Sequence, residues 1–293
     1  MLSLPTFSAR LPLLLLALAT PALAAATDCP EHFVAGQAPV ITQPKIKART
    51  QEVCFIAFAV LHSGVSRTPL YAAEHLTRAN LAQAKNLARK DSFHAETALR
   101  PADRAELEDY QRSGYDRGHL APNADMPTRE AQRESFSLAN MVPQIHANNA
   151  GVWAGLEAAA RQWAMDEGEL YVISGPAFVG SDLKKVGNVL VPTHLWKAVY
   201  SPKQQRAGVY LISNDETKDY AAISVADLEK MVGLNVLPGV PAAVRTKVAD
   251  LPKPLAQRGG GGNQDKAPPA EEGFQLKDLL QILLNFIQRI ISK

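Results

Sequence analysis

The chain has 293 residues and an almost balanced charge, with 31 Lys and Arg against 29 Asp and Glu and a formal net charge of +2. A chain of this length can bury a sizeable core, as one large domain or two small ones. The charge balance excludes a strongly basic protein. Any attraction to phosphate must therefore come from local clusters of positive side chains.

The N-terminus has the pattern of a leader. Arg10 precedes the apolar run 11–19, and small residues at A-x-A spacing follow through Ala25. This pattern is typical of a cleavable secretory signal, and the run is too short to span a bilayer. We therefore expect residues 1–24 to be a signal peptide and the mature protein to be periplasmic or secreted.

The sequence contains two cysteines, Cys29 and Cys54. An oxidising compartment would allow them to form a disulfide, which would staple the mature N-terminus to the segment around Cys54. The alternative is a pair of unpaired thiols.

The first half of the chain gives weak signals for secondary structure. Residues 25–51 are rich in Pro, Ala and Lys without a period, which indicates an extended arm. The apolar run 53–62 predicts one buried strand, and the spacing of apolar residues within 70–86 predicts a helix. Pro101 favours a short helix through Tyr110, because proline is tolerated at a first helical position.

The second half gives clearer patterns. A helix is predicted over 148–165, strands over 169–174, 189–200 and 208–213, and a helix over 224–231 that begins with a capping box. Strands and helices alternate without a strict βαβ rhythm. The sequence therefore predicts an α+β domain rather than a doubly wound sheet, and we place this domain at residues 25–251.

The composition changes sharply near Pro252. Residues 252–273 are rich in Gly, Pro and polar side chains, which is typical of a flexible linker. Residues 274–293 predict an amphipathic helix with a wide apolar face. Such a face fits docking on the domain, self-association as a homodimer or small bundle, and contact with a membrane surface.

The motif Asp116-Arg117-Gly118-His119 carries too much polar chemistry for a strand that only fills a core. Histidine is the side chain most readily used as a general base near neutral pH, and the planar fork of arginine suits phosphate. Glycine permits a close approach of the backbone. The alternative is an ion pair between Asp116 and Arg117 at a turn, with His119 capping a strand.

A second group of polar residues follows on the predicted helix. If Asn149 starts this helix, Glu157 lies about 80° round the axis and about 12 Å along it. Asn149 could then bind a hard cation through its amide oxygen, while Glu157 holds a water of the ion's shell. Magnesium suits such a site because it keeps several of its waters. The alternative is that Asn149 only caps the helix.

Several motifs together resemble one family, the DNA/RNA non-specific endonucleases, which include mitochondrial endonuclease G and secreted bacterial nucleases. The resemblance spans about residues 53–237. The motifs that carry it are Asp116-Arg117-Gly118-His119, Asn140-x-x-Pro143-Gln144, Asn149 with Trp153, Leu156 and Glu157, Ser174-Gly175-Pro176, and Val191-Pro192-Thr193-His194. Two departures are Ala139, where many relatives have serine, and the doublet Asn148-Asn149, where the usual pattern has a leucine before a single asparagine.

The resemblance implies a fold and an activity. The fold is a ββα-metal (His-Me finger) core within a mixed, mainly antiparallel α/β domain. The activity is hydrolysis of phosphodiester bonds in DNA and RNA without base specificity. The cofactor is one Mg²⁺ ion, for which Mn²⁺ can substitute.

The resemblance also implies roles for residues of the two groups. His119 matches the general base that activates water, and Asp116 matches the acid that supports the site. Asn149 matches the single direct protein ligand of the metal, and Glu157 matches the carboxylate that holds metal-bound water. Counting from Trp153 favours Asn149 over Asn148 as the ligand.

Two arginines complete the implied site. Arg117 matches the motif arginine. Arg89 matches an upstream arginine that contacts the phosphate, with Arg67 and Arg78 as alternatives. Two other functions share these residues: a secreted binding protein that retains the nuclease fold, and a phosphodiesterase for small nucleotides or lipid headgroups.

Overall fold

The structure is a computed structural model that describes residues 26–255 of the chain. The predicted signal peptide, the predicted C-terminal helix and most of the predicted linker lie outside the described residues. Within residues 26–255, no helix combines the length and the apolar character needed to cross a membrane.

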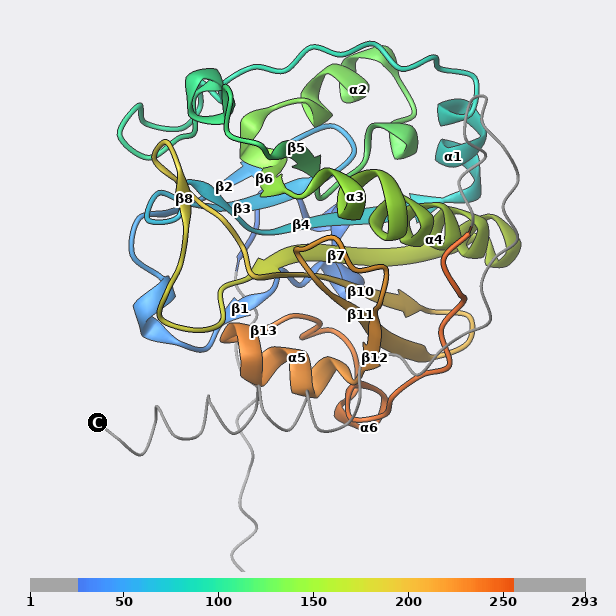
Figure 1. Ribbon diagram of the computed structural model, residues 1–293. Coiled ribbons are helices and arrows are strands. Elements are labelled where there is room, and N and C mark those ends of the chain that lie inside the picture. The colour runs from blue at the N-terminus through green and yellow to red at the C-terminus, as the bar shows by residue number, and fades with distance from the viewer. Residues whose placement is uncertain (1–25, 256–293) are drawn as a thin grey trace, which may run out of the picture.

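The centre of the molecule is a seven-stranded sheet in which every neighbouring pair is antiparallel (Figure 1). Its strands, in spatial order, are β12 (Ala221–Ile223), β11 (Arg206–Ser213), β10 (His194–Ser201), β7 (Glu169–Ala177), β4 (Thr68–Thr77), β3 (Ala59–Ser63) and β2 (Thr50–Cys54). The sheet and its helices confirm the predicted α+β class.

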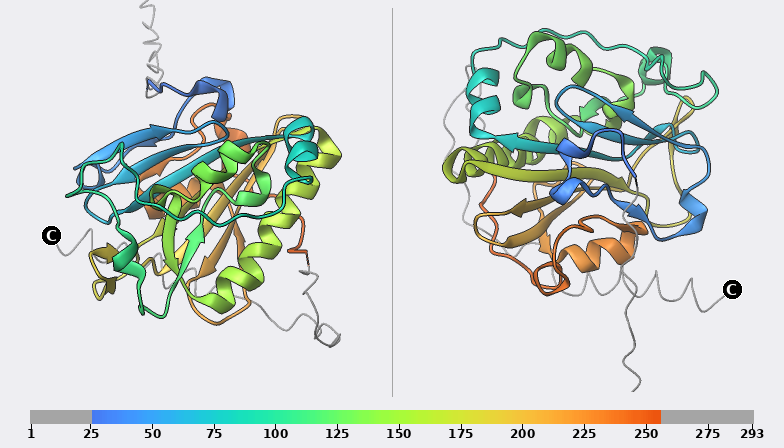
Figure 2. Two further views of the ribbon diagram at one scale, coloured as in Figure 1. Left: turned by 90° about the horizontal axis from the view of Figure 1, so that it is seen from above. Right: turned by 180° about the vertical axis from the view of Figure 1, so that it is seen from behind.

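Each face of the sheet is covered by a different layer, as the views in Figures 1 and 2 show. One face packs against α1 (Arg78–Ala84), α2 (Arg129–Ser135) and α4 (Ala154–Glu167). The other face packs against α5 (Val225–Val232) and the N-terminal segment around Phe33. Because side chains alternate along a strand, consecutive residues of the sheet serve different cores.

The predicted single strand over 53–62 is wrong. The run forms the end of β2 and most of β3, which pair with each other across a turn at residues 55–58. In this turn the backbone N–H of Phe55 donates to Phe58 O at 2.9 Å, and the two rings stack at 4.4 Å. Apolar turn residues of this kind leave no Gly or Pro signal in the sequence.

The predicted helix over 70–86 is wrong in its first half. Residues up to Thr77 belong to β4, and α1 begins at Arg78, with the Thr77 side chain accepting a hydrogen bond from the Asn80 N–H. Strand β4 lies between β3 and β7 with both of its faces covered. A strand buried on both faces loses the alternation by which it would be recognised.

Smaller differences concern short elements. Of the predicted helix 101–110, only Leu107–Tyr110 is helical, as a 3₁₀ turn. The extended arm contains 3₁₀ turns and the strand β1 (Val40–Ile41), which pairs with β13 (Leu234–Asn235). The remaining elements are β8 (Lys185–Val186), β9 (Val189–Leu190) and α6 (Ala242–Arg245), so the strand expected over 189–200 is divided between β9 and β10.

Other expectations are confirmed. Ser224 caps α5 by accepting from the Asp227 N–H at 3.1 Å. Strands β7 and β11 contain the predicted strands 169–174 and 208–213. Cys29 and Cys54 form a disulfide that joins the N-terminal segment to β2.

The last described residues lie against the domain. Tyr210 donates its hydroxyl to Pro252 O at 2.6 Å, and the Leu255 N–H donates to Gly155 O at 3.0 Å. A side chain at Gly155 would lie 2.8 Å from Leu255 O, which explains the glycine in the first turn of α4. Residues 252–255, expected in the linker, therefore contact the helical layer.

Candidate active site

The candidate site is built from two short strands followed by a helix, on the helical face of the sheet (Figure 1). Strand β5 (Asp116–His119) pairs antiparallel with β6 (Met141–Gln144), and His119 lies opposite Met141. The chain then turns into α3 (His146–Asn148), a π-helical turn over Asn149–Trp153, and α4. This order is the ββα arrangement that the resemblance implied.

Asp116 connects the strand to the helix. Its Oδ2 accepts a hydrogen bond from Asn149 Nδ2 at 2.9 Å and lies 2.8 Å from His146 Nδ1. Arg117 instead stacks over the ring of Phe93, with 3.9 Å between its Cζ and the ring centroid. Asp116 therefore positions the helix, which is a different role from a turn ion pair with Arg117.

The two neighbouring asparagines have different surroundings. Asn148 is buried and engaged at both ends: its Oδ1 accepts from Gln144 Nε2 at 2.7 Å, and its Nδ2 donates to Ser213 O at 2.7 Å. Asn149 is partly exposed, and its Nδ2 is held by Asp116. Among residues 26–255 its Oδ1 has no hydrogen-bond partner, so Asn149 is the asparagine with an oxygen available to a cation.

The interpretation of Asn149 as a helix cap is wrong. The helical segment begins at His146 with Ile145 in the cap position, and Asn149 lies inside it. Because residues 149–153 form a wider π turn, the α-helical spacing from Asn149 to Glu157 does not apply to this stretch. Such π turns inside helices occur often at functional sites.

The packing of the neighbouring strand explains why residue 118 is a glycine. A Cβ atom at this position would collide with the side chain of Gln144 on the neighbouring strand. The close approach expected at this glycine is therefore made by β6, and it brings the buried link from Gln144 to Asn148 directly under the motif.

The imidazole of His119 is enclosed by aromatic rings. His119 is 7% exposed, and its ring meets Phe136 edge-on at 5.0 Å and Phe93 at 5.8 Å. Trp153 Nε1 donates to His119 O at 3.0 Å and so ties the end of β5 to the helix. His119 Nε2 is buried without a hydrogen-bond partner among the described residues.

This environment keeps the imidazole neutral. Burial lowers the pKa of His119 to about 3, with the positive charges of Arg89 and Arg117 acting in the same direction and Asp91 opposing them. Both burial and neighbouring cations disfavour the protonated form of histidine. At neutral pH the ring therefore carries a free lone pair, as a proton acceptor requires.

Arg89 and Arg117 lie near His119, each over one of the two rings that pack against it. Arg117 lies over Phe93, and Arg89 lies over Phe136 with 5.3 Å between its Cζ and the ring centroid. Arg89 Nε also donates to Asp91 at 2.6 Å. Two guanidinium groups beside one imidazole can hold the oxygens of a phosphate.

The alternative arginines are engaged elsewhere. Arg67 donates to Arg104 O at 3.3 Å in the turn between β3 and β4. Arg78 donates to Met165 O at 2.7 Å and to Asp166 O at 3.1 Å, beyond the middle of α4. Arg89 is therefore the upstream arginine that the structure brings to His119.

Glu157 lies on α4 above a buried group of charged side chains. Burial raises the pKa of Glu157 to about 7, although the positive charges of Lys197 and Arg161 oppose this rise. Lys197 is buried, donates to Ser174 Oγ at 2.6 Å and lies 4.5 Å from the ring of Trp153. Lys197 therefore supports the helix that carries both Asn149 and Glu157.

Sequence reasoning missed Arg161 and Lys197. Arg161 pairs with Asp125 at 2.7 Å and follows Glu157 by four residues, so the two share a helix face. Lys197 stands in a strand where alternation predicts a buried side chain. A lysine at an inward position of an apolar strand was the available signal in the sequence.

The donor set fits a hard divalent cation. It offers the amide oxygen of Asn149 and the carboxylate of Glu157, and oxygen donors are what Mg²⁺ prefers. Within residues 26–255, three Cys, His, Asp or Glu ligand atoms converge at Cys29, Glu52 and Cys54, where the disulfide uses both sulfurs. The cysteine group is therefore no alternative to the oxygen site.

Comparisons with known proteins agree on one family. The sequence profile described as DNA/RNA non-specific endonuclease matches residues 38–243. A mitochondrial nuclease EXOG of Danio rerio is 32% identical over 208 residues, covering 63% of this chain and 59% of that protein. A nuclease of Nostoc sp. is 36% identical over 186 residues, covering 56% of this chain and 67% of that protein.

Two further matches extend the agreement. The mitochondrial Nuclease 1 of Schizosaccharomyces pombe is 30% identical over 208 residues, covering 62% of this chain and 65% of that protein. The chain thus spans less than two thirds of the length of the EXOG and Nuclease 1 relatives. A solved complex of EndoG with EndoGI, which concerns EndoG inhibition, matches with a TM-score of 0.61 and 25% identity over 66% of this chain and 88% of that chain.

Proposed function

Because the chain belongs to the DNA/RNA non-specific endonuclease family, we propose that it is a magnesium-dependent endonuclease that hydrolyses phosphodiester bonds of DNA and RNA without base specificity. The observation that carries this proposal is the buried imidazole of His119, enclosed by Phe93 and Phe136, with the guanidinium groups of Arg117 and Arg89 over these same two rings. It is supported by Asn149, whose oxygen is available on the adjoining helix.

Each side chain of the site has a separate role in the proposed hydrolysis. His119 takes a proton from the water that attacks phosphorus, and because burial lowers its pKa the imidazole is neutral and has a lone pair to accept that proton. Arg117 and Arg89 hold the non-bridging oxygens and stabilise the charge that develops on them. Asp116 fixes the amide of Asn149, so that its oxygen rather than its nitrogen is available.

Asn149 would hold the metal directly, and Glu157 would hold it through a water. When bound, Mg²⁺ supplies positive charge that stabilises the leaving oxygen, a contribution of several kcal/mol in metal-dependent hydrolases. Mn²⁺ would substitute, because it accepts the same oxygen ligands. The buried Lys197 and the partly buried Arg161 counter the effect of burial on Glu157 and favour its ionised form.

We also propose that the protein works outside the cytoplasm, as a periplasmic or secreted nuclease. The disulfide between Cys29 and Cys54 supports this location, because disulfides persist in oxidising compartments. Fusing residues 1–30 to a reporter that is active only after export would test it. A reporter that stays in the cytoplasm would contradict the proposal.

The C-terminal segment has a separate proposed role, as a site of homodimer or membrane-surface contact. Its test is deletion of residues 256–293, which leaves the packed residues 252–255 in place. The oligomeric mass and the binding to anionic liposomes are compared before and after deletion. If neither changes, both forms of the proposal fail.

The decisive experiment for the activity is a nuclease assay on single-stranded DNA, duplex DNA and RNA, with and without Mg²⁺. Wild type and His119→Ala are compared. We expect cleavage of all three substrates by wild type with Mg²⁺, and loss of cleavage in EDTA or in the variant. EDTA-insensitive cleavage would contradict the role of the metal.

A further inference from the structure

The proposed activity assigns no role to Asn214, the first residue after β11. Its side-chain amide is fully engaged. Oδ1 accepts a hydrogen bond from the Ile145 N–H at 2.9 Å, and Nδ2 donates to Pro143 O at 2.9 Å and to Pro192 O at 3.0 Å. Its backbone N–H donates to Thr193 O at 2.9 Å. One residue therefore joins the end of β11, the end of β6 and the connection before β10.

The orientation of this amide follows from its neighbours. A carbonyl oxygen can only accept a hydrogen bond and a backbone N–H can only donate one. The nitrogen of Asn214 therefore faces the two prolines, and its oxygen faces Ile145. Pro143 and Pro192 are both buried. Of the side chains of this size, only an amide offers one acceptor and two donors to such a place.

The bonds from Asn214 lie on both sides of the residue at which strand becomes helix. Gln144 is the last residue of β6, and α3 begins at His146 with Ile145 as its cap. Asn214 contacts the residue before Gln144 through Pro143 O and the residue after it through the Ile145 N–H. The direction in which the chain leaves β6 is therefore fixed by one side chain.

Ser213 holds the first turn of the helix in the same way. Its backbone O accepts from Asn148 Nδ2 at 2.7 Å, and Asn148 Oδ1 accepts from Gln144 Nε2 at 2.7 Å. Gln144 and Asn148 are fully buried. We call Ser213 and Asn214 the junction clamp, because their hydrogen bonds run to the end of β6, along α3 and back to β11.

The junction clamp connects two of the motifs that carry the family resemblance. One motif contains Pro143 and Gln144, and the other contains Pro192. These prolines are far apart in the sequence, and each offers its carbonyl oxygen to the same nitrogen of Asn214. The two motifs are therefore parts of one arrangement around the junction.

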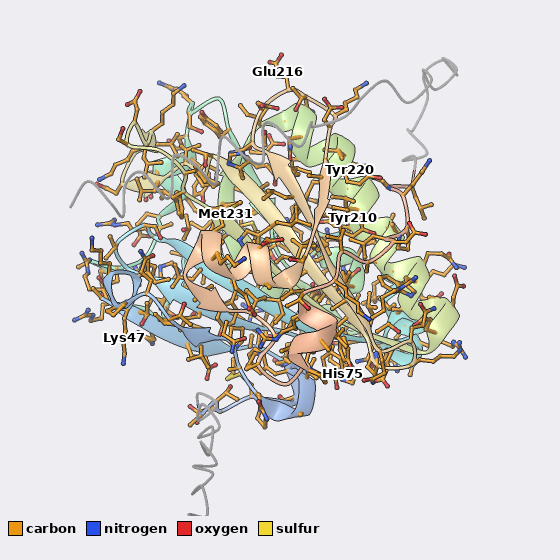
Figure 3. All side chains as sticks on the ribbon, turned by 90° about the horizontal axis from the view of Figure 1, so that it is seen from below. Lys47, His75, Tyr210, Glu216, Tyr220 and Met231 are labelled. Carbon is orange, nitrogen blue, oxygen red and sulfur yellow. A yellow bond between two sulfur atoms is a disulfide. The ribbon has the colours of Figure 1, made fainter. Side chains whose placement is uncertain are left out.

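Beyond Asn214 the chain turns to the surface. Figure 3 labels Glu216, two residues further along, at an edge of the molecule. Asp215, Glu216 and Lys218 are exposed, whereas Asn214 is partly buried. The side chain of Asn214 thus contacts β6 and not the exposed connection that follows it.

The junction sets the distance between the two halves of the candidate site. His119 lies in β5, which is paired with β6, and Asn149 follows the first turn of helix after Gln144. Asp116 holds Asn149 from the side of β5. A rotation at the junction would move Asn149 relative to His119 without changing either side chain. A displacement of about 1 Å can cost ~10²-fold in rate.

We propose that Asn214 is a positioning residue for the metal ligand of the proposed nuclease. Through Pro143 and Ile145 it fixes the direction of α3, and so it holds Asn149 in place beside His119. The inference rests on the proposed function. Because Asn214 touches neither nucleic acid nor metal in this arrangement, its loss should weaken metal binding and leave the binding of nucleic acid unchanged.

The main test is binding of Mn²⁺ alone to the full chain, measured by the electron paramagnetic resonance signal of the free ion. Asn214→Ala removes all three side-chain hydrogen bonds. It should weaken Mn²⁺ binding by about 10–100-fold, the range found when a residue that orients a metal ligand is removed. Circular dichroism at the same temperature establishes that the variant is folded. An unchanged affinity for Mn²⁺ in the folded variant would overturn the proposal.

Kinetics and nucleic-acid binding give a second readout. Asn214→Ala should lower kcat and raise the Mg²⁺ concentration needed for half of the full rate. Binding of single-stranded DNA in EDTA should stay at the wild-type value, because Arg89 and Arg117 keep their contacts with Phe136 and Phe93. A residue that only stabilises the fold would change none of these values in folded protein. Loss of DNA binding in EDTA would contradict the proposal.

The matched control is Thr193→Val, in the connection next to the junction clamp. Thr193 Oγ1 accepts from the Val179 N–H at 2.9 Å and donates to Ala177 O at 3.0 Å, so its bonds lead to the end of β7 and the residues after it. Valine keeps the shape and the backbone oxygen that Asn214 uses. The urea midpoint should fall, with Mn²⁺ affinity and kcat unchanged. If Thr193→Val weakens Mn²⁺ binding as much as Asn214→Ala, the proposal fails.

A second variant covers the case in which Asn214→Ala does not fold. Asn214→Ser leaves room for a water that can bond the same groups, and it is then measured in the same way. If neither variant folds, Asn214 is a structural residue and the positioning role is rejected. Wild type that neither binds Mn²⁺ nor cleaves nucleic acid would refute the nuclease function. Wild type that does both, with an Asn214→Ala that does both equally well, would refute the positioning role alone.

Discussion

The two faces of the seven-stranded sheet are built from the same strands but have different chemistry. On one face Trp196, Tyr71 and Phe33 pack in an apolar core. On the other face Lys197 and Glu74 are buried beneath the helix that carries Asn149 and Glu157. Trp196 and Lys197 are neighbours in one strand, and alternation alone sends them to opposite faces.

The charged face has buried groups that are costly for the fold. Glu74 has a buried Oε1 without a partner among the described residues, and its pKa is raised well above the ordinary value, first by burial and then by Asp125. Replacing such charges by apolar groups is often neutral or stabilising in other proteins. Lys197 and Glu74 lie close to Glu157 of α4, and we infer that they support this helix.

The largest effect is expected from His119→Ala, on the charged face. Loss of the base should reduce plasmid nicking by about 10²–10⁴-fold, with the circular dichroism spectrum unchanged. His75→Ala is the matched control, because His75 stacks on Tyr171 on the opposite face. Retention of even about a tenth of the activity by His119→Ala would rule out its role as base.

The two asparagines form a second test on the site face. Asn149→Ala should abolish Mg²⁺-dependent cleavage while the urea midpoint stays close to wild type, because Asn149 is partly exposed. Asn148→Ala should instead lower the free energy of unfolding by about 1–3 kcal/mol, because it leaves buried partners unsatisfied. The reverse assignment of effects would make Asn148 the ligand.

Substitutions at Lys197 and Trp196 compare the two faces of the sheet within one strand. Lys197→Met should lower the free energy of unfolding by about 3–5 kcal/mol, because it leaves buried carboxyls unpaired, and it should also lower kcat. Trp196→Phe removes the bond to Pro176 O and should lower stability only. Urea unfolding and kcat at saturating Mg²⁺ are measured for both. An unchanged kcat in Lys197→Met would limit the lysine to a structural role.

Removing the disulfide tests the contribution of the apolar face. Replacing Cys29 and Cys54 together by serine should lower the free energy of unfolding by about 2–4 kcal/mol, since the bridge closes a long loop of the unfolded chain. Because Cys29 belongs to the apolar core, kcat should remain unchanged. A loss of kcat at temperatures where the variant is folded would show that the two faces are coupled.

The smallest effect concerns pH. Because burial raises the pKa of Glu157 to about 7, the metal-free protein holds a proton there below that pH, and metal binding must release it. The apparent affinity for Mg²⁺ should therefore fall as pH drops below about 7, by up to about tenfold per unit. Glu157→Gln should remove this dependence in calorimetric titrations. A pH-independent affinity in wild type would contradict it.

The protonation state of His119, unlike that of Glu157, should not change near neutral pH. Its pKa is lowered to about 3, so the imidazole stays neutral from pH 8 down to well below 5 and imposes no loss of kcat at saturating Mg²⁺. The unfolded chain binds a proton at His119 below its ordinary pKa of 6.5 and the folded protein does not. Folding stability therefore falls as pH decreases through this window.

The sequence pointed to the residues of the candidate site more directly than to the strands around it. Asp116, His119 and Asn149 could be found because their chemistry is local and stands in fixed short motifs. The strand β4 could not, because its burial comes from β3 and β7, which are distant in sequence. The division of 53–62 into two strands depends on an apolar turn, for which a single sequence carries no signal.

The charged residues that lie beneath the site could not be predicted from the sequence either. Lys197, Arg161 and Asp125 come from separate elements and meet only after the sheet and α4 pack. The choice between Asn148 and Asn149 likewise depends on Ser213, which lies in β11 and is far away along the chain. Local motifs point to the residues that we propose to react, whereas the pKa values of these residues depend on the packed fold.

The hydrogen bond from Leu255 to Gly155 fixes where the chain leaves the domain. That point lies on the first turn of α4, two residues before Glu157. The described part of the chain therefore ends beside the candidate site. A change that displaces residues 252–255 would therefore act on the first turn of the helix that carries Glu157.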